Sequence, residues 1–546
     1  MNGEPEKKER LRDRLFLLAA FLLPFCAIVA IRLLMAHSWG EVGYDAMYHA
    51  GIAKLGPSVI TGGEFPWLDS SIWKTAFADK EMLYHLSLWA IFRIQALFGV
   101  TAEPPFHFAA AFFLMLLCGS FVFAGIRFRV PPALLCAGSL LFTLLTPTWT
   151  YRMAMMRPLI VSIAFFLLIC GLLERGSLKA RFIQVAVISF LYSWTYSNPH
   201  FIVIPVLVFS LFALARDGVR ILLLPLVSLV SVLLGLLAHP QFPNSFKIWK
   251  LQSWDALLSP LLADHLISKP TEMLPPSFIW GVYALPLFLM TYVTVLYMIR
   301  LTERKGWRNI SPSLFALAFL AWGFTGGIFL AMRSMEYAAP LTVLLFLILL
   351  ARAQEEDLLN PFRRTGVKVQ LTVLFLLSLS LGGFVMTKTI LDGRKAINHV
   401  PRGIAMWMKE NLEPNEAVIN LDWSDFPMLF YASPDHRYQW GLDPVFSLAV
   451  QPEKTHLMNS TRTIDKIPPA SSLMKRVFGC RYAVLLYPRF QHAAFLQQNG
   501  WRLKYKVMSP DDSNRLEGWI FALDARDSLS SHNAPARMMK GRKNPK

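Results

Sequence analysis

Long apolar runs constrain this chain of 546 residues more than any other feature of its sequence. Most are close to the ~20 residues that a helix needs to cross a bilayer. Hydrophobic residues make up 54% of the chain and charged residues only 16%, against roughly 25% in soluble domains. The pattern predicts a polytopic α-helical membrane protein with about eleven spans, at residues 15–36, 104–126, 132–150, 158–173, 182–197, 200–215, 221–238, 277–299, 312–330, 337–351 and 369–390.

Basic residues are distributed unevenly between the loops that join these runs. If the N-terminus lies inside, the inner segments hold 20 Lys and Arg in 61 residues, and the outer segments hold 10 in 119. Cytoplasmic loops carry such an excess, so we expect a cytoplasmic N-terminus. The net charge of +18 then reflects membrane topology and does not indicate a nucleic-acid partner. A twelfth apolar run, 82–98, fits an amphipathic helix lying in the membrane interface.

The composition becomes that of a soluble domain at about residue 391. A helix is expected over 396–411, and strands are expected over 417–421, 482–487, 502–507 and 518–523. Alternating helices and strands predict an α/β domain over 391–526, which eleven crossings place on the extracytoplasmic side. Residues 527–546 form a basic tail that we expect to be disordered. The preceding residues, 1–390, form the membrane domain, with long outer loops over 37–102 and 239–276.

The loop 37–102 carries most of the candidate chemistry. Two pairs, Asp45 with His49 and Glu81 with His85, are four residues apart and would share a helix face. Acids and imidazoles are costly to desolvate near a bilayer, so their presence indicates a working site. Asp79 lies close to the second pair. The alternative is a solvated external loop without a function of its own.

Two arginines stand in short outer turns at the ends of predicted spans. Arg157 lies in the turn 151–158, and Arg333 lies in the turn 333–337. A guanidinium at such a place can bind a phosphate through two parallel hydrogen bonds. The alternative is an arginine whose charge merely reaches the lipid headgroups.

A third group of candidates follows the first predicted strand of the soluble domain. Asp422, Trp423 and Asp425 lie in the loop after that strand, where side chains often bind ligands. Ordinary turn and helix-cap chemistry explains the same acids equally well.

The arrangement of these parts resembles the GT-C superfamily of membrane glycosyltransferases, which use polyprenyl-phosphate-linked sugars, and it is most like the oligosaccharyltransferase catalytic subunit. That family carries an Asp-x-x-Tyr-His motif in the first outer loop, which matches Asp45 to His49. Its outer domain opens with a helix, a turn containing Pro, a strand and a Trp-Trp-Asp-Tyr-Gly motif. Residues 422–426 stand at that last place, without the tandem Trp. The family's second acidic motif is absent from the turn 151–158, which contains no acid.

The resemblance implies an inverting glycosyltransferase that moves a sugar from a polyprenyl phosphate or diphosphate to an extracytoplasmic glycan, lipid or protein. In this reading Asp45 and His49 are catalytic, and Arg157 and Arg333 bind the donor phosphate. Either a divalent cation, Mg²⁺ or Mn²⁺, is bound by Asp79, Glu81 and His85, since hard cations prefer oxygen ligands, or the enzyme needs no metal. The acceptor would meet Asp422, Trp423 and Asp425, and membrane lipids would surround the spans.

Two other classes of function remain open on the sequence. A lipid or solute transporter or flippase would favour ionisable residues in the middle of spans, whereas few charges lie inside the predicted spans here. A non-catalytic envelope assembly protein would tolerate the loss of Asp45. We expect the protein in a bacterial inner membrane in each case.

Overall fold

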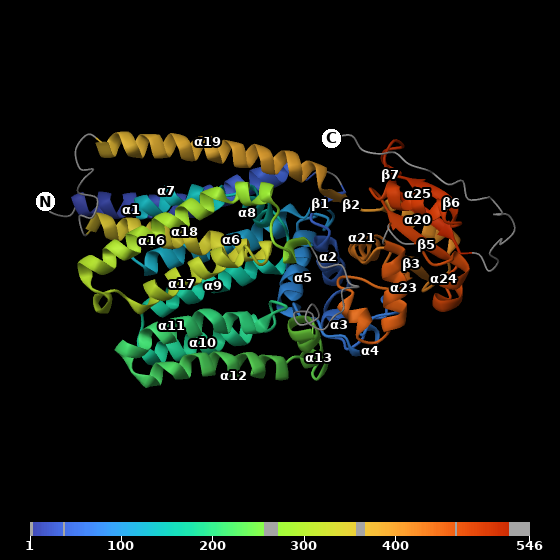
Figure 1. Cartoon of the computed structure of the whole chain (residues 1–546), viewed down its shortest axis with the longest axis horizontal. Coiled ribbons are helices and arrows are strands. Elements are labelled where there is room, and N and C mark those ends of the chain that lie inside the picture. The colour runs from blue at the N-terminus through green and yellow to red at the C-terminus, as the bar shows by residue number, and fades with distance from the viewer. Residues whose placement is uncertain are drawn as a thin grey trace, which may run out of the picture.

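The computed structural model describes residues 4–36, 39–255, 271–355, 366–462, 464 and 467–523. The predicted basic tail and part of the outer loop 239–276 lie outside the described residues. A bundle of long helices fills one half of the molecule, and a domain containing a sheet fills the other (Figure 1). The first outer loop lies between them, and the beginning of α1 (Glu4–Met35) lies at the far end of the bundle.

A helix occupies each of the eleven predicted spans. After α1 the bundle contains α6 (His107–Arg127), α7 (Pro132–Thr143), α8 (Pro147–Met153), α9 (Pro158–Glu174), α10 (Leu178–Tyr192), α11 (Val203–Asp217), α12 (Leu223–Leu237), α15 (Phe278–Tyr283), α16 (Leu285–Lys305), α17 (Pro312–Gly327), α18 (Met335–Glu355) and α19 (Gly366–Lys395). Among the described residues, six helical segments are long and apolar enough to cross a membrane, or seven if a bent pair counts as one span. The chain is therefore polytopic, and eleven crossings remain a prediction.

The bent pair is a departure from the single span predicted over 132–150. Helices α7 and α8 meet at 97°. Pro147 begins α8, and Thr146 before it is extended and caps the helix by accepting a hydrogen bond from the Trp149 backbone N–H. The residue before a proline avoids the helical conformation, so the sequence breaks the span at this point. The break sets α8 at a sharp angle to α7, and Tyr151, Arg152 and Arg157 after it line a cavity that also contains residues of the C-terminal domain.

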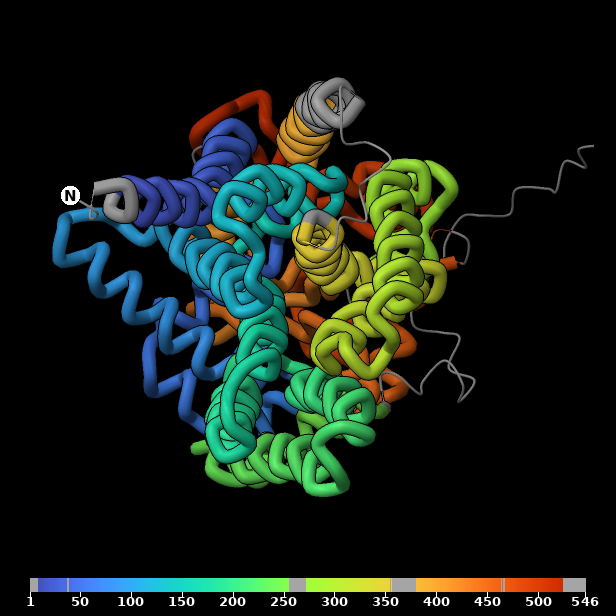
Figure 2. The backbone as a smooth tube through the Cα atoms, turned by 90° about the vertical axis from the view of Figure 1, so that its left-hand side faces the viewer, coloured from blue at the N-terminus to red at the C-terminus, as the bar shows by residue number. Residues whose placement is uncertain are grey.

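Helix α18 is the centre of the bundle. Most of its length is buried among neighbouring helices, and it lies inside the ring of tubes in the view along the bundle (Figure 2). By contrast, α1 and α19 lie at the rim.

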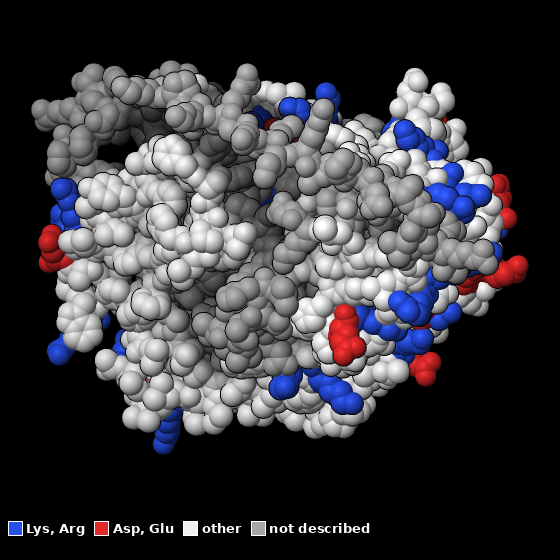
Figure 3. Space-filling model, turned by 45° about the vertical axis from the view of Figure 1, so that its right-hand side comes forward, with Lys and Arg blue, Asp and Glu red and all other residues white. Residues whose placement is uncertain are grey.

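On the face shown in Figure 3, charged side chains gather over the sheet domain and at the opposite end of the bundle. The described surface between them carries few charges, as expected of a membrane-embedded surface.

The first outer loop folds into short elements and is tied to the chain that follows the last bundle helix. Its elements are β1 (Gly40–Val42), α2 (Asp45–Leu55), α3 (Pro57–Ile60), α4 (Trp73–Ala76) and α5 (Met82–Leu97), the last being the helix predicted over 82–98. Strand β1 pairs antiparallel with β2 (Ile397–His399), with Glu41 opposite Asn398. The buried Glu41 carboxylate is 2.6 Å from the Arg32 guanidinium at the end of α1. The loop therefore starts from a fixed anchor.

The C-terminal domain is the predicted α/β unit. Its sheet has the order β4-β3-β5-β7-β6, in which β3 lies parallel to β4 and β5, and β7 lies antiparallel to β5 and β6. The strands are β3 (Ala417–Asn420), β4 (Arg437–Tyr438), β5 (Tyr482–Leu486), β6 (Arg502–Met508) and β7 (Leu516–Ala522), and the helices are α20 (Arg402–Asn411), α21 (Phe426–Ala432), α22 (Val445–Leu448), α23 (Pro452–Arg462), α24 (Ser471–Phe478) and α25 (Phe490–Gln498).

Alternate residues of β5 enter two different cores. Val484 and Leu486 pack with α20 and with residues of the first outer loop, whereas Ala483 and Leu485 pack with α24 and α25. Side chains on a strand alternate between its two faces, so both faces of the sheet are covered. The first of these cores also contains Tyr48 of α2. The first outer loop and the C-terminal domain thus share one hydrophobic core, which fixes α2 against the domain.

Candidate active site

A cavity of about 960 Å³ lies between the bundle and the C-terminal domain. Such a volume is typical of sites that hold small molecules. The bundle contributes Arg152, Arg157, Arg394 and Lys395, the outer loops contribute Asp45 and Glu272, and the C-terminal domain contributes Arg515 and Glu517. Asp45 and Arg157, predicted from distant parts of the sequence, therefore share one cavity, whereas His49 and Arg333 are not among its lining residues.

Asp45 reaches this cavity because it is the first residue of α2. Gly43 before it has φ of +84°, a conformation that favours glycine, and turns the chain from β1 into the helix. An acid in the first turn is favoured by the helix dipole. The Asp45 side chain is 21% exposed, and its carboxylate accepts a hydrogen bond from Arg157. Helix α2 packs against α21 of the C-terminal domain, which holds Asp45 in place.

Three arginines and three carboxylates form one ion-pair network around Arg157. Glu272 pairs with Arg152, with Arg157 at 3.7 Å and with Arg333 at 3.2 Å. Glu336 continues the network, 3.0 Å from Arg152 and 3.6 Å from Arg333. With Asp45 on Arg157, the six charges balance. The arginines therefore stay charged and ordered before any ligand arrives.

The pKa values of the network follow from these pairs. Burial by itself would raise the pKa of the Glu272 carboxyl, but the guanidiniums of Arg333, Arg157 and Arg152 outweigh it and hold that pKa well below its usual range. Burial opposes the charge on Arg157, and the carboxylates of Asp45 and Glu272 outweigh this effect and raise the pKa of Arg157. Arg157 therefore stays protonated and can contact an anion that enters the cavity, although the three carboxylates neutralise the network as a whole.

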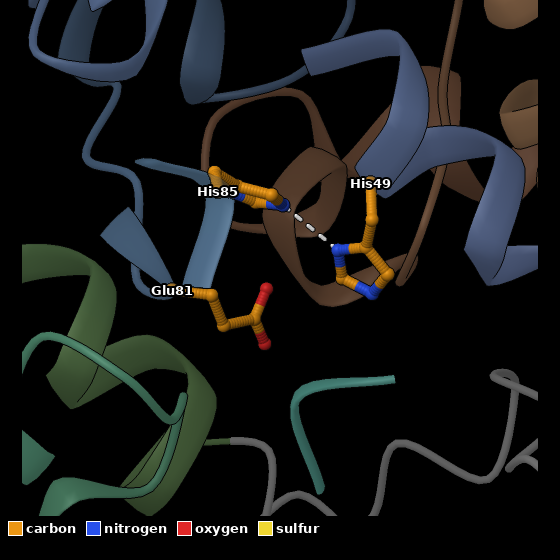
Figure 4. Close-up of side chains that lie close together, drawn as sticks. All are labelled: His49, Glu81 and His85. Carbon is orange, nitrogen blue, oxygen red and sulfur yellow. Dashed lines mark hydrogen bonds between the residues drawn. The ribbon is translucent and has the colours of Figure 1, made fainter. Parts of the chain in front are cut away.

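A second cluster, His49, Glu81 and His85, lies deeper and is buried. Figure 4 shows the two imidazoles facing each other, with the Glu81 side chain extending toward the same space. His49 Nδ1 is 2.8 Å from His85 Nε2, and His85 Nδ1 lies 2.7 and 2.8 Å from the two oxygens of Asp79. One ligand atom from each of the three residues lies within 4.8 Å of the others, so these residues could hold a metal ion.

Burial favours the uncharged forms of His49 and Glu81 in this second cluster. Burial, followed by the charges of His85 and Arg157, lowers the pKa of His49 well below its usual value. Burial likewise raises the pKa of Glu81, and the nearby Lys80 and His85 only partly offset it. The predicted metal residues Asp79, Glu81 and His85 are thus brought together, and His49, predicted as catalytic, joins them.

The residues predicted to meet the acceptor form a third, largely buried group. The Asp422 carboxylate is 2.8 Å from Arg462 and 3.3 Å from Arg489, and Asp425 pairs with Arg489 and accepts from the Leu486 backbone N–H at 3.0 Å. Trp423 is 7% exposed. These contacts hold the start of α21, so the structure gives Asp422 and Asp425 clear roles in packing. Contact with an acceptor stays a prediction.

Three members of the network, Arg152, Glu272 and Glu336, escaped the sequence-based prediction, as did Tyr196 beside it. Tyr196 accepts a hydrogen bond from Arg333 at 3.3 Å. Two signals were available in the sequence. Arg152 lies in the same turn as Arg157, and Glu336 follows Arg333 by three residues, which places both on one helix face. Nothing in the sequence marks Glu272 as the residue that joins the three arginines.

No family model matches the chain, and no curated protein matches it. Solved structures do resemble it. The oligosaccharyltransferase AglB of the archaeon Archaeoglobus fulgidus, in complex with an inhibitory peptide and a dolichol-phosphate, has a TM-score of 0.57 at 12% identity, covering 94% of this chain and 75% of that chain. ArnT from Cupriavidus metallidurans bound to undecaprenyl phosphate has a TM-score of 0.52 at 15% identity, covering 94% and 98%.

A further structure of the Archaeoglobus fulgidus oligosaccharyltransferase is tethered with an acceptor peptide. It has a TM-score of 0.56 at 12% identity, covering 93% of this chain and 74% of that chain. The resemblance to GT-C glycosyltransferases is therefore confirmed at the level of the fold, over most of the chain. The fold is that of an integral membrane protein.

Proposed function

We propose that the protein is a membrane glycosyltransferase that moves a sugar from a polyprenyl phosphate or diphosphate to an extracytoplasmic acceptor. The observation that carries the proposal is the cavity in which Asp45 and Arg157 meet, at the junction of an apolar bundle and a C-terminal domain. The similar structures of AglB and ArnT hold dolichol-phosphate and undecaprenyl phosphate, both polyprenyl phosphates. A donor of this kind needs a membrane for its tail and cations for its phosphate.

Arg157 and Arg333 bind the donor phosphate in this proposal, with Arg152 beside them. A guanidinium has five N–H donors, so Arg157 can contact a phosphate while it still holds Asp45. When the bond between the anomeric carbon and the phosphate oxygen breaks, the electron pair stays on the phosphate. Fixed positive charges near that oxygen stabilise the transition state.

Asp45 acts on the acceptor. Its carboxylate takes the proton of an acceptor hydroxyl or amine while the acceptor atom forms the new bond to the anomeric carbon. A single displacement of this kind inverts the anomeric configuration. Glu272 keeps the arginines aligned, because it contacts all three of them.

The residues His49, Glu81 and His85 could hold a divalent cation, which would add positive charge beside the first outer loop. The transfer described above needs only Asp45 and the arginines.

The C-terminal domain forms the outer wall of the cavity and is the part that an acceptor would meet first. We place this domain outside a bacterial inner membrane, with the N-terminus in the cytoplasm.

The purified full-length protein in lipid nanodiscs tests the proposal. A panel of polyprenyl phosphates and diphosphates carrying different sugars is offered with extracted envelope material as acceptor. Release of the free polyprenyl phosphate or diphosphate, with the sugar recovered on an acceptor, supports transfer. Movement of the intact lipid across the bilayer without loss of sugar would instead show a flippase and overturn the proposal.

A further inference from the structure

We propose that His49, Glu81 and His85 form a binding site for a divalent transition metal of the zinc class, apart from the cavity that contains Asp45. The three residues are buried, and one ligand atom of each lies within 4.8 Å of the others. Figure 4 shows that the three side chains converge from two segments of the first outer loop. None of the three is among the described residues that line the cavity. The inference stands on this geometry and does not depend on the proposed sugar transfer.

The local structure holds the three ligands rigidly. Glu81 and His85 are one helical turn apart at the start of α5, and His49 lies in the middle of α2, which packs against α5. The rings of Tyr48 and Tyr84 enclose His49 edge-on, with centroids 5.3 and 5.2 Å from its ring. A bound ion would replace the His49–His85 hydrogen bond and join two helices that already pack against each other.

Asp79 prepares His85 for a metal. Its carboxylate lies 2.7 Å from His85 Nδ1 and so fixes the proton on that nitrogen. The lone pair is then on Nε2, which faces His49 at 2.8 Å. Metal-ligating histidines commonly donate their other N–H to a carboxylate in this way.

Glu81 lacks the partners that a buried carboxylate ordinarily has. Its side chain is 7% exposed, and no described residue donates a hydrogen bond to its carboxylate. Lys80 Nζ is 4.0 Å away. Burying a carboxylate is costly unless a cation or a metal compensates it. A divalent ion between Glu81 and the two imidazoles would provide that compensation.

The kinds of ligand atoms in this cluster favour one class of metal ion over another. Two imidazole nitrogens and one carboxylate suit Zn²⁺ and its transition-metal neighbours, whereas Mg²⁺ prefers oxygen ligands and retains several waters. The structure thus favours a different ion from the Mg²⁺ or Mn²⁺ expected from the acids of this loop. Three protein ligands leave room for a water as the fourth ligand.

Metal titration of the purified full-length protein tests the inference. After removal of metal with EDTA, Zn²⁺ is added in competition with a chromophoric chelator, and bound metal is counted by mass spectrometry. We expect one Zn²⁺ per chain that a large excess of Mg²⁺ does not displace. His49→Gln and Glu81→Gln should each weaken Zn²⁺ binding more than ~100-fold, and Asp79→Asn by ~10- to 100-fold.

His436→Gln is the matched control. His436 is also buried, but it lies in the C-terminal domain, where its Nδ1 is 2.8 Å from the Ser433 hydroxyl, so its loss should leave Zn²⁺ binding unchanged. Wild-type protein that binds no stoichiometric Zn²⁺ would overturn the inference, as would variants that keep wild-type affinity. If a variant does not fold, the visible spectrum of Co²⁺ bound to the wild-type protein tests the site instead. The expected spectrum is that of Co²⁺ with nitrogen and oxygen ligands in tetrahedral geometry. A Co²⁺ spectrum typical of hydrated octahedral ions would contradict the site.

Discussion

Asp45 is a carboxylate whose position is set by three different parts of the chain. Helix α2 carries it, Arg157 pairs with it, and α21 packs against its helix. The side chain is nevertheless 21% exposed and lines the cavity, so a substrate can reach it. A residue that served only to neutralise the charge of Arg157 would not need this access. Glu272 also pairs with that arginine, so Asp45 is not required for this purpose alone.

Replacing Asp45 by Asn should abolish most sugar transfer and leave the protein folded. Asn keeps the size of the side chain and removes its basicity, and loss of a general base typically costs ~10²- to 10⁴-fold in rate. Transfer rate and apparent Tm in detergent are measured together. Glu64→Gln, at an exposed acid of the same loop, is the control that should keep full activity. Wild-type transfer by a folded Asp45→Asn protein would remove Asp45 from the mechanism.

Arg333→Ala should lose more activity than Arg333→Lys. Hydrogen bonds to charged groups contribute ~1.5–3 kcal/mol each, so removing the guanidinium should raise the KM for the donor by ~10- to 100-fold. Lysine restores the charge but not the paired hydrogen bonds, and it should recover part of the loss. Wild-type kinetics in both variants would mean that Arg333 serves only the lipid headgroups and its contacts with Glu272 and Glu336.

At the level of single elements, β1 depends on an ion pair that closes the end of α1. Glu41 accepts hydrogen bonds from Arg32, from the Val42 backbone at 2.6 Å and from the Phe106 backbone at 2.8 Å, and it is fully buried. This carboxylate therefore serves the fold rather than the cavity. An acid so close to Asp45 in sequence is not a neutral control for activity.

Glu41→Ala should destabilise the protein strongly. Breaking a buried pair by removing one partner typically costs ~3–5 kcal/mol, because the other charge is left uncompensated. The expected result is a large fall in apparent Tm, together with exposure of the β1–β2 linkage to proteolysis. A Tm within one or two degrees of the wild type would show that Arg32 finds another partner.

The turn before α21 should respond to pH through Asp425. Burial raises the pKa of Asp425 to about 6, against the effect of Arg489. Between the pKa of the unfolded chain, near ~4, and about 6, the folded protein binds more protons. The stability that this group contributes is complete at low pH and is lost as the pH rises through 6. The Tm of the wild type minus that of Asp425→Asn should therefore fall between pH 4 and 6.5, and a rise would contradict the assignment.

The sequence could place the helices because apolar length and proline positions are local properties. It could also single out Asp45, Arg157 and Arg333, since a charge beside a membrane span is conspicuous. It could not pair Glu272 with Arg152, because these residues are 120 positions apart and meet only through the fold. Likewise, an Asp in a turn looks the same whether it binds a ligand or, like Asp425, anchors a neighbouring arginine.

At the scale of the whole molecule, the first outer loop and the C-terminal domain act as one body. Phe65 and Trp73 of the loop share a buried core with Phe426, Phe430 and the sheet. The ion-pair network links the same body to the bundle through Arg157 and Arg333. Any movement of the C-terminal domain would therefore move Asp45 relative to the arginines, since Asp45 belongs to the loop and the arginines to the bundle.

The membrane topology of the chain determines on which side of the membrane the cavity lies. The beginning of α1 and the C-terminal domain lie at opposite ends of the bundle (Figure 1), and the excess of basic residues on the inner loops predicts that the N-terminus is cytoplasmic. Single cysteines at two exposed positions test this, Lys8→Cys in α1 and Gln498→Cys in α25. The background carries Cys26→Ser and Cys136→Ser, because Cys118, Cys170 and Cys480 are buried.

A membrane-impermeant maleimide should label Gln498→Cys in intact cells or spheroplasts, and it should label Lys8→Cys only after the membrane is opened. The cavity is bounded on one side by the C-terminal domain, so outside labelling would place Asp45 and the arginines at the outer surface, where an extracytoplasmic acceptor could reach them. The reverse pattern would put the whole cavity in the cytoplasm. A sugar donor facing outward could then not reach Asp45, and the extracytoplasmic reaction would have to be abandoned even if both variants fold and bind polyprenyl phosphate.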